Sequence, residues 1–181
     1  RTPAERAEAM MRLSAFLTAP SSFMPESEAH LLDHEATSQL GGTEVDQRVI
    51  WGTTVQINQT WTHFKRFFIE FTTEENPDDP LYPTILEQMH SRGVNNLNLD
   101  CSNLSKWDEL EDTSLYRHIV NYPQEVVPLV DLVVNEIYRI SFNLDQDTPH
   151  VIQVRPFNLL SIKKMRDLNP IDIDKLISVN G

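Results

Sequence analysis

The stretch VQINQTWTHFKRFFIEF, residues 55–71, decides the fold. Its large apolar side chains recur at intervals of three and four residues, and they are Ile57, Trp61, Phe64, Phe68 and Phe71. Because an α-helix places such positions on one face, the segment predicts a helix with a nearly continuous aromatic stripe. Aromatic side chains dominate the energetics of protein cores, so this stripe predicts the centre of a packed domain.

Three further helices are predicted after this one. The first covers residues 81–93, where Gly93 is a natural C-terminal cap, and the others cover 115–122 and 123–144. Pro128 lies inside the last pattern and removes one helix hydrogen bond. It either bends that helix or leaves the residues before it as a separate turn.

Extended segments are predicted at three places. Apolar and polar residues alternate at 97–101 and again at 152–154, a pattern typical of strands. Pro156 confines the end of the second strand to a sheet edge or a bulge. Residues 170–176 predict a short helix, and residues 177–179 begin another strand. The chain ends as that strand begins, so we expect a piece of a longer protein at the start of a β domain.

The sequence therefore predicts a mainly α fold in three parts. Residues 49–150 are predicted to form a four-helix bundle, and residues 151–181 to lead into a β domain. Residues 1–48 are predicted to be a flexible acidic extension that carries an amphipathic helix at 3–17. A helix isolated by a linker has no core of its own and can bury its apolar stripe in a partner's groove. The stripe proposed for partner docking consists of Met10, Leu13, Phe16 and Leu17.

The charge is distributed unevenly along the chain. The whole sequence has 27 acidic and 15 basic residues, a net charge of −12. Residues 1–48 have 8 acidic and 4 basic side chains, residues 49–150 have 16 and 6, and residues 151–181 have 3 and 5. Since nucleic acid is held by Lys and Arg at its phosphates, only the last part is a candidate for binding it. The residues proposed for this are Arg155, Lys163, Lys164 and Arg166, although a solvated strand end explains so small a cluster equally well.

Signatures of enzymatic chemistry are missing from the sequence. None of the five glycines precedes Lys-Ser or Lys-Thr, so there is no phosphate-binding P-loop, and no zinc, dinucleotide or serine-hydrolase motif occurs. The single cysteine cannot form an internal disulfide or supply a zinc cage. No apolar run approaches the roughly 20 residues of a membrane span. We therefore predict no catalytic, cofactor-binding or metal-binding residue and no membrane contact.

Two weaker constellations leave alternatives open. Cys101 with His118 and Asp100 has the residue types of a thiol triad, but a lone Cys among alternating apolar residues is usually a buried thiol. His30 and His34 have the spacing of metal ligands on a helix, yet a solvated acidic tail explains them as well.

Several separate motifs, in the same order, make the chain resemble the minichromosome maintenance (MCM) helicases. They are VIWGT at 49–53, NYPQEV at 121–126, QVRPFN at 153–158, and MRDLNP with DIDKL over 165–176. Within that family the chain is most similar to subunit four of the eukaryotic heterohexamer. The similarity covers residues 49–181 and leaves residues 1–48 without a match.

The resemblance implies that residues 49–150 are the helical A subdomain of the MCM N-terminal region. Residues 151–181 would then lead into the family's oligonucleotide-binding (OB) β barrel, truncated here. The family's zinc ribbon, DNA-binding hairpin and ATPase module follow that point. ATP, Mg²⁺ and zinc would accordingly belong to the full-length protein.

The same resemblance implies a function and partners. The full-length protein would be a nuclear, ATP-dependent DNA helicase that is loaded at replication origins. Its partners would be the other MCM subunits in a heterohexamer and double hexamer, the S-phase initiation kinase, other replication factors and DNA. Our first hypothesis for residues 1–181 is a non-catalytic protein-interaction and regulatory collar. The alternatives are a DNA-binding module using residues 155–166 and, last, a small thiol enzyme.

Overall fold

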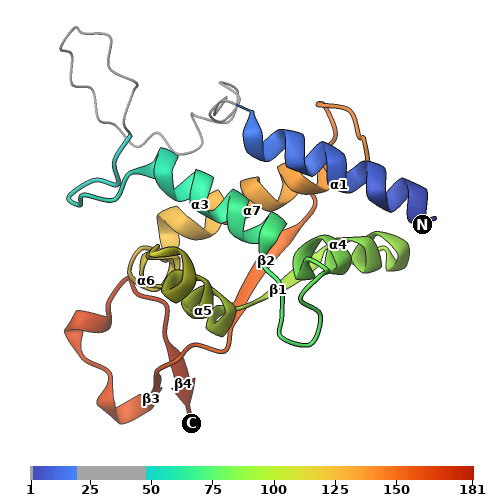
Figure 1. Cartoon of the computed structure of the whole chain (residues 1–181). Helices are drawn as coiled ribbons and strands as arrows, with labels where there is room; N and C mark the ends of the chain where they lie inside the picture. The colour runs from blue at the N-terminus through green and yellow to red at the C-terminus, as the bar shows by residue number, and fades with distance from the viewer. Residues whose placement is uncertain (1, 20–47) are drawn as a thin grey trace, which may run out of the picture.

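The computed structural model describes residues 2–19 and 48–181. The pair His30 and His34 lies outside the described residues. The described part is mainly helical with a few short strands, as predicted (Figure 1). Its helices are α1 Pro3–Thr18, α3 Ile57–Glu70, α4 Leu81–Arg92, α5 Cys101–Glu111, α6 Leu115–Asn121 and α7 Pro123–Ser141. Its strands are β1 Asn96–Asp100, β2 Gln153–Phe157, β3 Ile162–Lys164 and β4 Ser178–Asn180.

The aromatic stripe of α3 lies at the centre of the core, as its periodicity predicts. Its aromatic members are at most 5% exposed. Phe67, which the predicted stripe does not include, also has no exposed surface, and its ring lies 5.1–5.8 Å from those of Phe68, Phe71, Tyr82 and Trp107. Edge-on or tilted ring pairs at such distances contribute about 0.5–1.5 kcal/mol each beyond the area that they bury. Tyr82 comes from α4 and Trp107 from α5, so one ring cluster joins three helices.

One predicted helix boundary is explained by a single residue. α4 ends at Arg92 and is capped by Gly93, whose φ of 65° lies in the left-handed region that glycine adopts without strain. α7 is continuous from Pro123 to Ser141, so Pro128 does not split it. Pro128 lies in the second turn, where its missing N–H removes a single hydrogen bond near the helix start.

The structure has five helices between residues 49 and 150 rather than the four that periodicity predicts. The missed helix is α5: the alternation of Leu97, Leu99 and Cys101 predicts an extended segment, whereas α5 begins at Cys101. Asp100 causes the change, because its carboxylate accepts hydrogen bonds from the backbone N–H and the hydroxyl of Ser102 (2.9 and 2.7 Å). A side chain that satisfies an N–H at this position caps a helix start.

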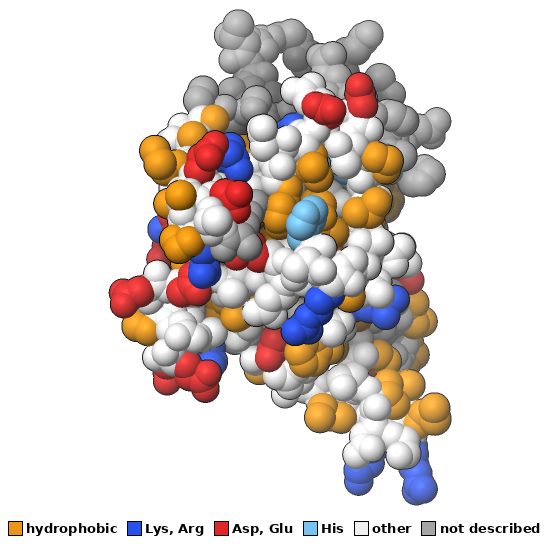
Figure 2. Space-filling model, turned by 90° about the vertical axis from the view of Figure 1, so that its right-hand side faces the viewer, with side chains coloured by type: hydrophobic (Ala, Val, Ile, Leu, Met, Phe, Trp, Pro, Cys, Tyr) orange, Lys and Arg blue, Asp and Glu red, His pale blue; other side chains and the backbone are white. Residues whose placement is uncertain are grey.

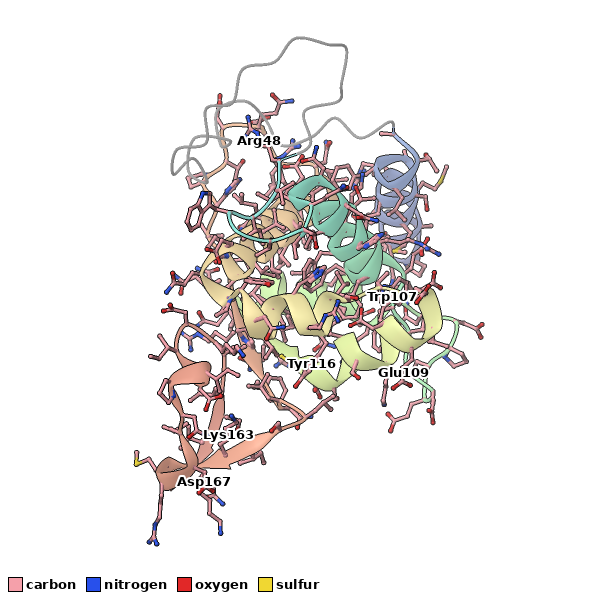
Figure 3. All side chains as sticks on the ribbon, turned by 90° about the vertical axis from the view of Figure 1, so that its left-hand side faces the viewer. Arg48, Trp107, Glu109, Tyr116, Lys163 and Asp167 are labelled. Carbon is pink, nitrogen blue, oxygen red and sulfur yellow. The ribbon has the colours of Figure 1, made fainter. Side chains whose placement is uncertain are left out.

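The start of α6 is held by a side chain of α5. Asp108 accepts hydrogen bonds from the backbone N–H groups of Leu115 and Tyr116, both at 2.8 Å, and from the hydroxyl of Thr113. The first N–H groups of a helix have no partner within the helix, so this carboxylate satisfies donors that would otherwise be left unpaired. Asp108 thereby fixes α5 and α6 to each other. Figure 3 labels Trp107 on α5 and Tyr116 on α6.

A two-stranded parallel sheet joins distant parts of the chain. β1 pairs with β2, with Leu97 opposite Val154. Side chains of α7 bond to the backbone around β2: Asn135 both donates to and accepts from Ile152 (2.8 and 3.0 Å), and Asp131 accepts from the N–H of Val154 (2.7 Å). These side chains take the place of a neighbouring strand, so that part of the backbone is satisfied without a third strand.

Residues 158–181, called the C-terminal projection below, extend away from the helices (Figure 1). β3 and β4 pair in parallel there, and the helix predicted after Asn169 is a single 3₁₀ turn, Pro170–Asp172. Two hydrogen bonds tie this projection to α6: Leu160 N–H to the Tyr116 hydroxyl (3.0 Å) and Leu176 N–H to the Val120 carbonyl (2.9 Å). The OB-type barrel stays a prediction, since only these short strands are present over residues 151–181.

α1 forms where the sequence predicts it and belongs to the same body as the other helices. It packs against α3 and α7, and Ala9 and Leu13 are at most 2% exposed (Figure 1). Thr2 and Glu5 form a reciprocal capping box at its start. None of the described helices has both the length and the apolar character needed to cross a membrane.

We expect Asp108→Ala to destabilise the protein by about 2–3 kcal/mol, because two backbone donors and one hydroxyl lose a charged acceptor. Urea unfolding followed by circular dichroism measures this change. Glu109→Ala is the matched control, since Glu109 is an exposed neighbour on the same helix (Figure 3). Equal stability of the two variants would contradict the role given to Asp108.

Candidate functional site

Three of the four residues proposed for nucleic-acid binding lie together on the C-terminal projection. Lys163 and Lys164 end β3, and Arg166 follows in the 3₁₀ turn Met165–Asp167. Figure 3 shows Lys163 and Asp167 near the end of the projection, and Figure 2 shows Lys and Arg side chains at its tip. Lys164 and Arg166 are exposed, so both can meet a phosphate without rearrangement.

Lys163 differs from its neighbours because it already has an anionic partner. Its ammonium group donates to the carboxylate of Asp172, which also accepts the N–H of Asn169 (3.0 Å). The hydrogen bond from Lys163, with that of Asn169, lowers the pKa of Asp172. Lys163 therefore helps to fix the fold of the projection, and the exposed cations of the cluster are Lys164 and Arg166.

Arg155, the fourth residue of the set, lies on β2 rather than on the tip. Its side chain is exposed while Val154 before it is buried, as expected for a strand with one covered face. The four predicted residues therefore lie in two places: Arg155 is on β2, and Lys163, Lys164 and Arg166 are together at the tip of the projection.

Exposed apolar side chains surround the basic tip. Five of them are 60–71% exposed, namely Leu160, Ile162, Met165, Ile171 and Ile173. Figure 2 shows hydrophobic side chains directly above the Lys and Arg side chains of the tip. An exposed apolar group of this kind next to cations is typical of a surface that contacts another macromolecule.

The docking role of α1 was inferred from the premise that this helix is isolated and has no core of its own, and that premise is wrong. Leu13 is 1% exposed, and Met10, Phe16 and Leu17 pack against the core of the same chain. The helix is not isolated, because it packs against α3 and α7. Leu13 is buried by this packing, and Met10, Phe16 and Leu17 stay partly exposed.

The environment of Cys101 does not support the thiol-triad alternative. The side chain is fully buried, and burial, followed by the charge of Asp100, raises its pKa to about 11. The reactive form of cysteine is the thiolate, which is scarce at neutral pH for such a group. Asp100 is bonded to Ser102 and Asn158 instead. Cys101 is thus a buried core thiol, the ordinary interpretation of its sequence pattern.

Two histidines of the helical part, His63 and His118, have pKa values that respond to the same carboxylate, Asp108. Burial is the largest cause that lowers the pKa of both His63 and His118, and the cations Arg66 and Arg117 add to it. Asp108 partly opposes the effect at both rings. Nδ1 of His118 is buried without a hydrogen-bond partner. Within residues 2–19 and 48–181, no three His, Cys, Asp or Glu side chains gather as a metal site.

The most exposed large hydrophobic side chain of the described residues is one that sequence reasoning did not assign to a site. Trp51 is 87% exposed and lies at the corner of a tight turn. The turn is closed by a hydrogen bond from the N–H of Thr53 to the carbonyl of Ile50 (3.0 Å), and Gly52 supplies its φ of 74°. The Trp-Gly pair was the available signal, because Gly at this turn position allows a bulky residue before it to point outward.

Comparison with known proteins identifies the family. The model of the MCM N-terminal domain matches residues 62–158, from α3 through the end of β2. The chain belongs to the MCM N-terminal domain family.

The curated relatives carry one shared name. The chain is 36% identical to "DNA replication licensing factor MCM4" of Drosophila melanogaster over 87% of its length, and 41% identical to mcm4 of Xenopus tropicalis over 74%. It is 31% identical to mcm4 of Schizosaccharomyces pombe over 93% of its length. These alignments span 18%, 16% and 20% of the respective relatives, so the chain corresponds to less than a quarter of each. The resemblance to subunit four of the MCM family is thereby confirmed.

We expect acid to destabilise the protein through His63 and His118. Because the folded-state pKa of each lies below the usual 6.5, the unfolded chain binds more protons in this range. The stability that these two histidines contribute is therefore fully present above about pH 6.5 and is lost as the pH drops toward the folded-state values. Urea midpoints at pH 7.5 and pH 5.5 measure the loss.

The double variant His63→Gln with His118→Gln should show a smaller loss on acidification than the wild type. An equal pH response in the variant and the wild type would mean that other groups cause the acid sensitivity.

Proposed function

We propose that residues 1–181 act as a non-catalytic protein-interaction and regulatory collar of an MCM replicative helicase subunit. The full-length protein would be an ATP-dependent DNA helicase of the nucleus that works in replication initiation and unwinding. The observation that supports this most is the family match over residues 62–158, together with relatives named as replication licensing factors. ATP, Mg²⁺ and zinc belong to other parts of such a protein in this proposal.

The surface of the helical part is suited to protein partners rather than to DNA. Residues 49–150 have 16 acidic and 6 basic side chains, so their net charge of −10 repels phosphates. The other subunits of the heterohexamer and double hexamer are the partners that we propose, with the S-phase initiation kinase and other replication factors as further ones. Trp51 is our candidate for a contact residue, because rigid exposed aromatic residues often dominate binding energies at interfaces.

We expect Trp51→Ala to weaken binding to the other MCM subunits at least tenfold, the loss typical of a buried interface aromatic. The chain is co-expressed with those subunits, and its recovery in their complex is measured by size exclusion and quantitative mass spectrometry. Leu110→Ala removes a comparably exposed apolar side chain (78%) from α5 and should leave recovery unchanged. If the wild-type chain is not recovered with any MCM subunit, the proposed function fails.

The exposed cations of the tip favour a second candidate function, a DNA-binding module. Lys164 and Arg166 project into solvent on a segment whose net charge is positive, with 5 basic and 3 acidic residues over 151–181. Two cations would make few phosphate contacts, so the expected affinity is low and strongly dependent on salt.

We expect Lys164→Glu with Arg166→Glu to abolish binding to a fluorescein-labelled single-stranded oligonucleotide at low salt. Fluorescence anisotropy measures binding, and the wild-type log–log salt slope should be about −1.4 for two phosphate contacts on a single strand. Lys106→Glu with Arg117→Glu is the matched control, since it changes the net charge equally on the helical part. Equal losses for both pairs would show that overall charge, not the tip, controls the interaction.

A further inference from the structure

The two outer edges of the β1–β2 sheet differ in how their backbone groups are satisfied. The outer edge of β2 is closed by side chains of α7. Asn135 bonds to both backbone groups of Ile152, and Asp131 accepts the N–H of Val154 (2.7 Å). Pro156 is the next residue that points to this edge, and it has no N–H to offer. A further strand would find the donors on this side already used.

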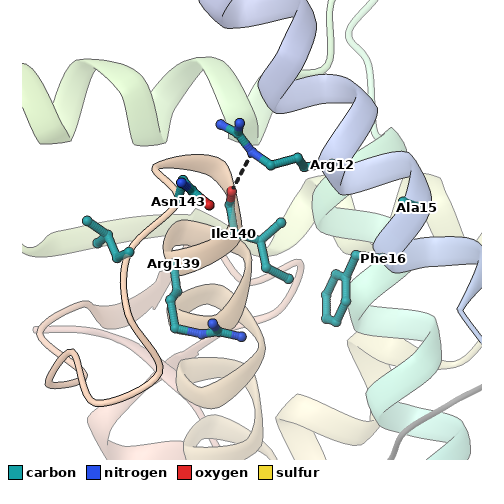
Figure 4. A pocket seen from close by; sticks show the side chains of 7 residues that line it. Arg12, Ala15, Phe16, Arg139, Ile140 and Asn143 are labelled. Atoms are coloured by element: carbon teal, nitrogen blue, oxygen red, sulfur yellow. Dashed lines mark hydrogen bonds between the residues drawn. The ribbon is translucent and has the colours of Figure 1, made fainter.

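The helix that closes this edge is itself held in place. α7 packs against α1, α3 and α6. Arg12 of α1 also donates to the carbonyl of Ile140 near the end of α7 (3.1 Å; Figure 4). α7 therefore stays beside β2, and the sheet cannot grow on this side without disruption of the core.

β1 leaves its own outer edge open. The N–H of Gln153 donates to the carbonyl of Asn95 (2.9 Å), so every second residue of β1, starting from Leu97, directs its backbone groups to β2. Because successive residues of a strand alternate in direction, the backbone groups of Asn96 and Asn98 point the other way. Within the described residues no hydrogen bond reaches these groups, and both residues are exposed.

The open edge of β1 lacks the usual protection against another strand. Natural proteins place a lysine, a proline or a bulge on such an edge. β1 has the sequence NLNLD, which contains neither residue, and it pairs with β2 residue for residue, without a bulge. β2 is also the only described element with which β1 makes an extensive contact. The edge thus offers a row of free backbone donors and acceptors to a further strand.

The side chains of β1 and the charge around it define which strand fits. Leu97 and Leu99 are at most 1% exposed, so a neighbour on their face of the sheet meets an apolar surface. Asn96 and Asn98 lie on the other face, where a polar neighbour can hydrogen-bond to their amides. Residues 49–150 have 16 acidic and 6 basic side chains, a net charge of −10, and therefore attract a basic segment.

From the open edge, its side chains and its charge we infer that β1 binds a basic, extended segment of a partner protein as a third strand of the sheet. Apolar residues of this segment lie beside Leu97 and Leu99, and polar or basic residues alternate with them. Backbone hydrogen bonds to Asn96 and Asn98 supply affinity, and the alternating side chains supply specificity. The inference goes beyond the proposed function and does not depend on it, because the partner need not be an MCM subunit.

The test uses the full chain and a short fluorescein-labelled peptide in which valine alternates with lysine and threonine. Fluorescence anisotropy measures binding of the peptide to the wild type and to Asn98→Pro. Proline at this position removes an outward N–H but no bond of the β1–β2 ladder, as Pro156 does on β2. We expect Asn98→Pro to weaken binding at least fivefold. Asn98→Thr, the matched control, keeps the N–H and should bind within twofold of the wild type.

Hydrogen exchange in the wild type tests the edge without any substitution. The amide N–H of Asn98 should exchange several-fold more slowly when the peptide saturates the protein, as followed by NMR of the ¹⁵N-labelled chain. The N–H of Trp51, in the turn before α3, is the internal control and should not change. Unchanged exchange at Asn98 would overturn the inference, because the peptide would then be bound elsewhere.

The remaining outcomes are equally decisive. Circular dichroism checks that Asn98→Pro is folded, and a folded variant that binds the peptide as well as the wild type contradicts the inference. So does a wild type that does not bind the peptide. A peptide with glutamate in place of lysine should bind at least tenfold more weakly, and equal binding would contradict the basic chemistry of the partner. A wild-type dimer that Asn98→Pro dissociates, as seen by sedimentation, would assign the edge to a second copy instead.

Discussion

The ring cluster around Phe67 is the contact on which the rest of the structure depends. It joins α3 to α4 and α5 through Tyr82 and Trp107, so three successive helices share one fixed point. α6, α7 and the two strands of the sheet add their own buried apolar side chains to this core, among them Leu115, Val130 and Val154. Polar contacts such as that of Asp108 then fix where individual helices begin.

Sequence periodicity predicts the helices whose apolar residues recur every three or four positions. It misses α5, where a strand pattern and a helix pattern share a residue. α3, α4, α6 and α7 appear where three- and four-residue intervals predict them. α5 is hidden because Cys101 continues the alternation of β1, although Cys101, Leu104 and Trp107 also repeat every three residues. The pairing of β1 with β2, and the role of Asp131 and Asn135 beside it, depend on contacts across more than fifteen residues. Local patterns carry no information about such contacts.

The candidate sites divide in a similar way. Composition was sufficient to find the basic cluster, because a local excess of charge must lie somewhere on the surface. It could not show that Lys163 is neutralised by Asp172, nine residues away, or that the stripe of α1 is buried on its own chain. Both results come from tertiary packing. Trp51 entered the sequence analysis only as part of the motif at 49–53, because its exposure, which makes it a candidate contact residue, is known only from the structure.

The way β2 is held has a mechanical consequence. β2 is bonded to β1 by a parallel ladder, while α7 bonds to Ile152 and Val154 and Asp100 accepts a hydrogen bond from Asn158. A force that pulls on the C-terminal projection along the strand loads these bonds together, in shear, rather than opening them one after another. Bonds loaded in parallel share the force, so the junction is stiff along this axis. The projection can therefore transmit tension or torque to the helical body without first detaching from it.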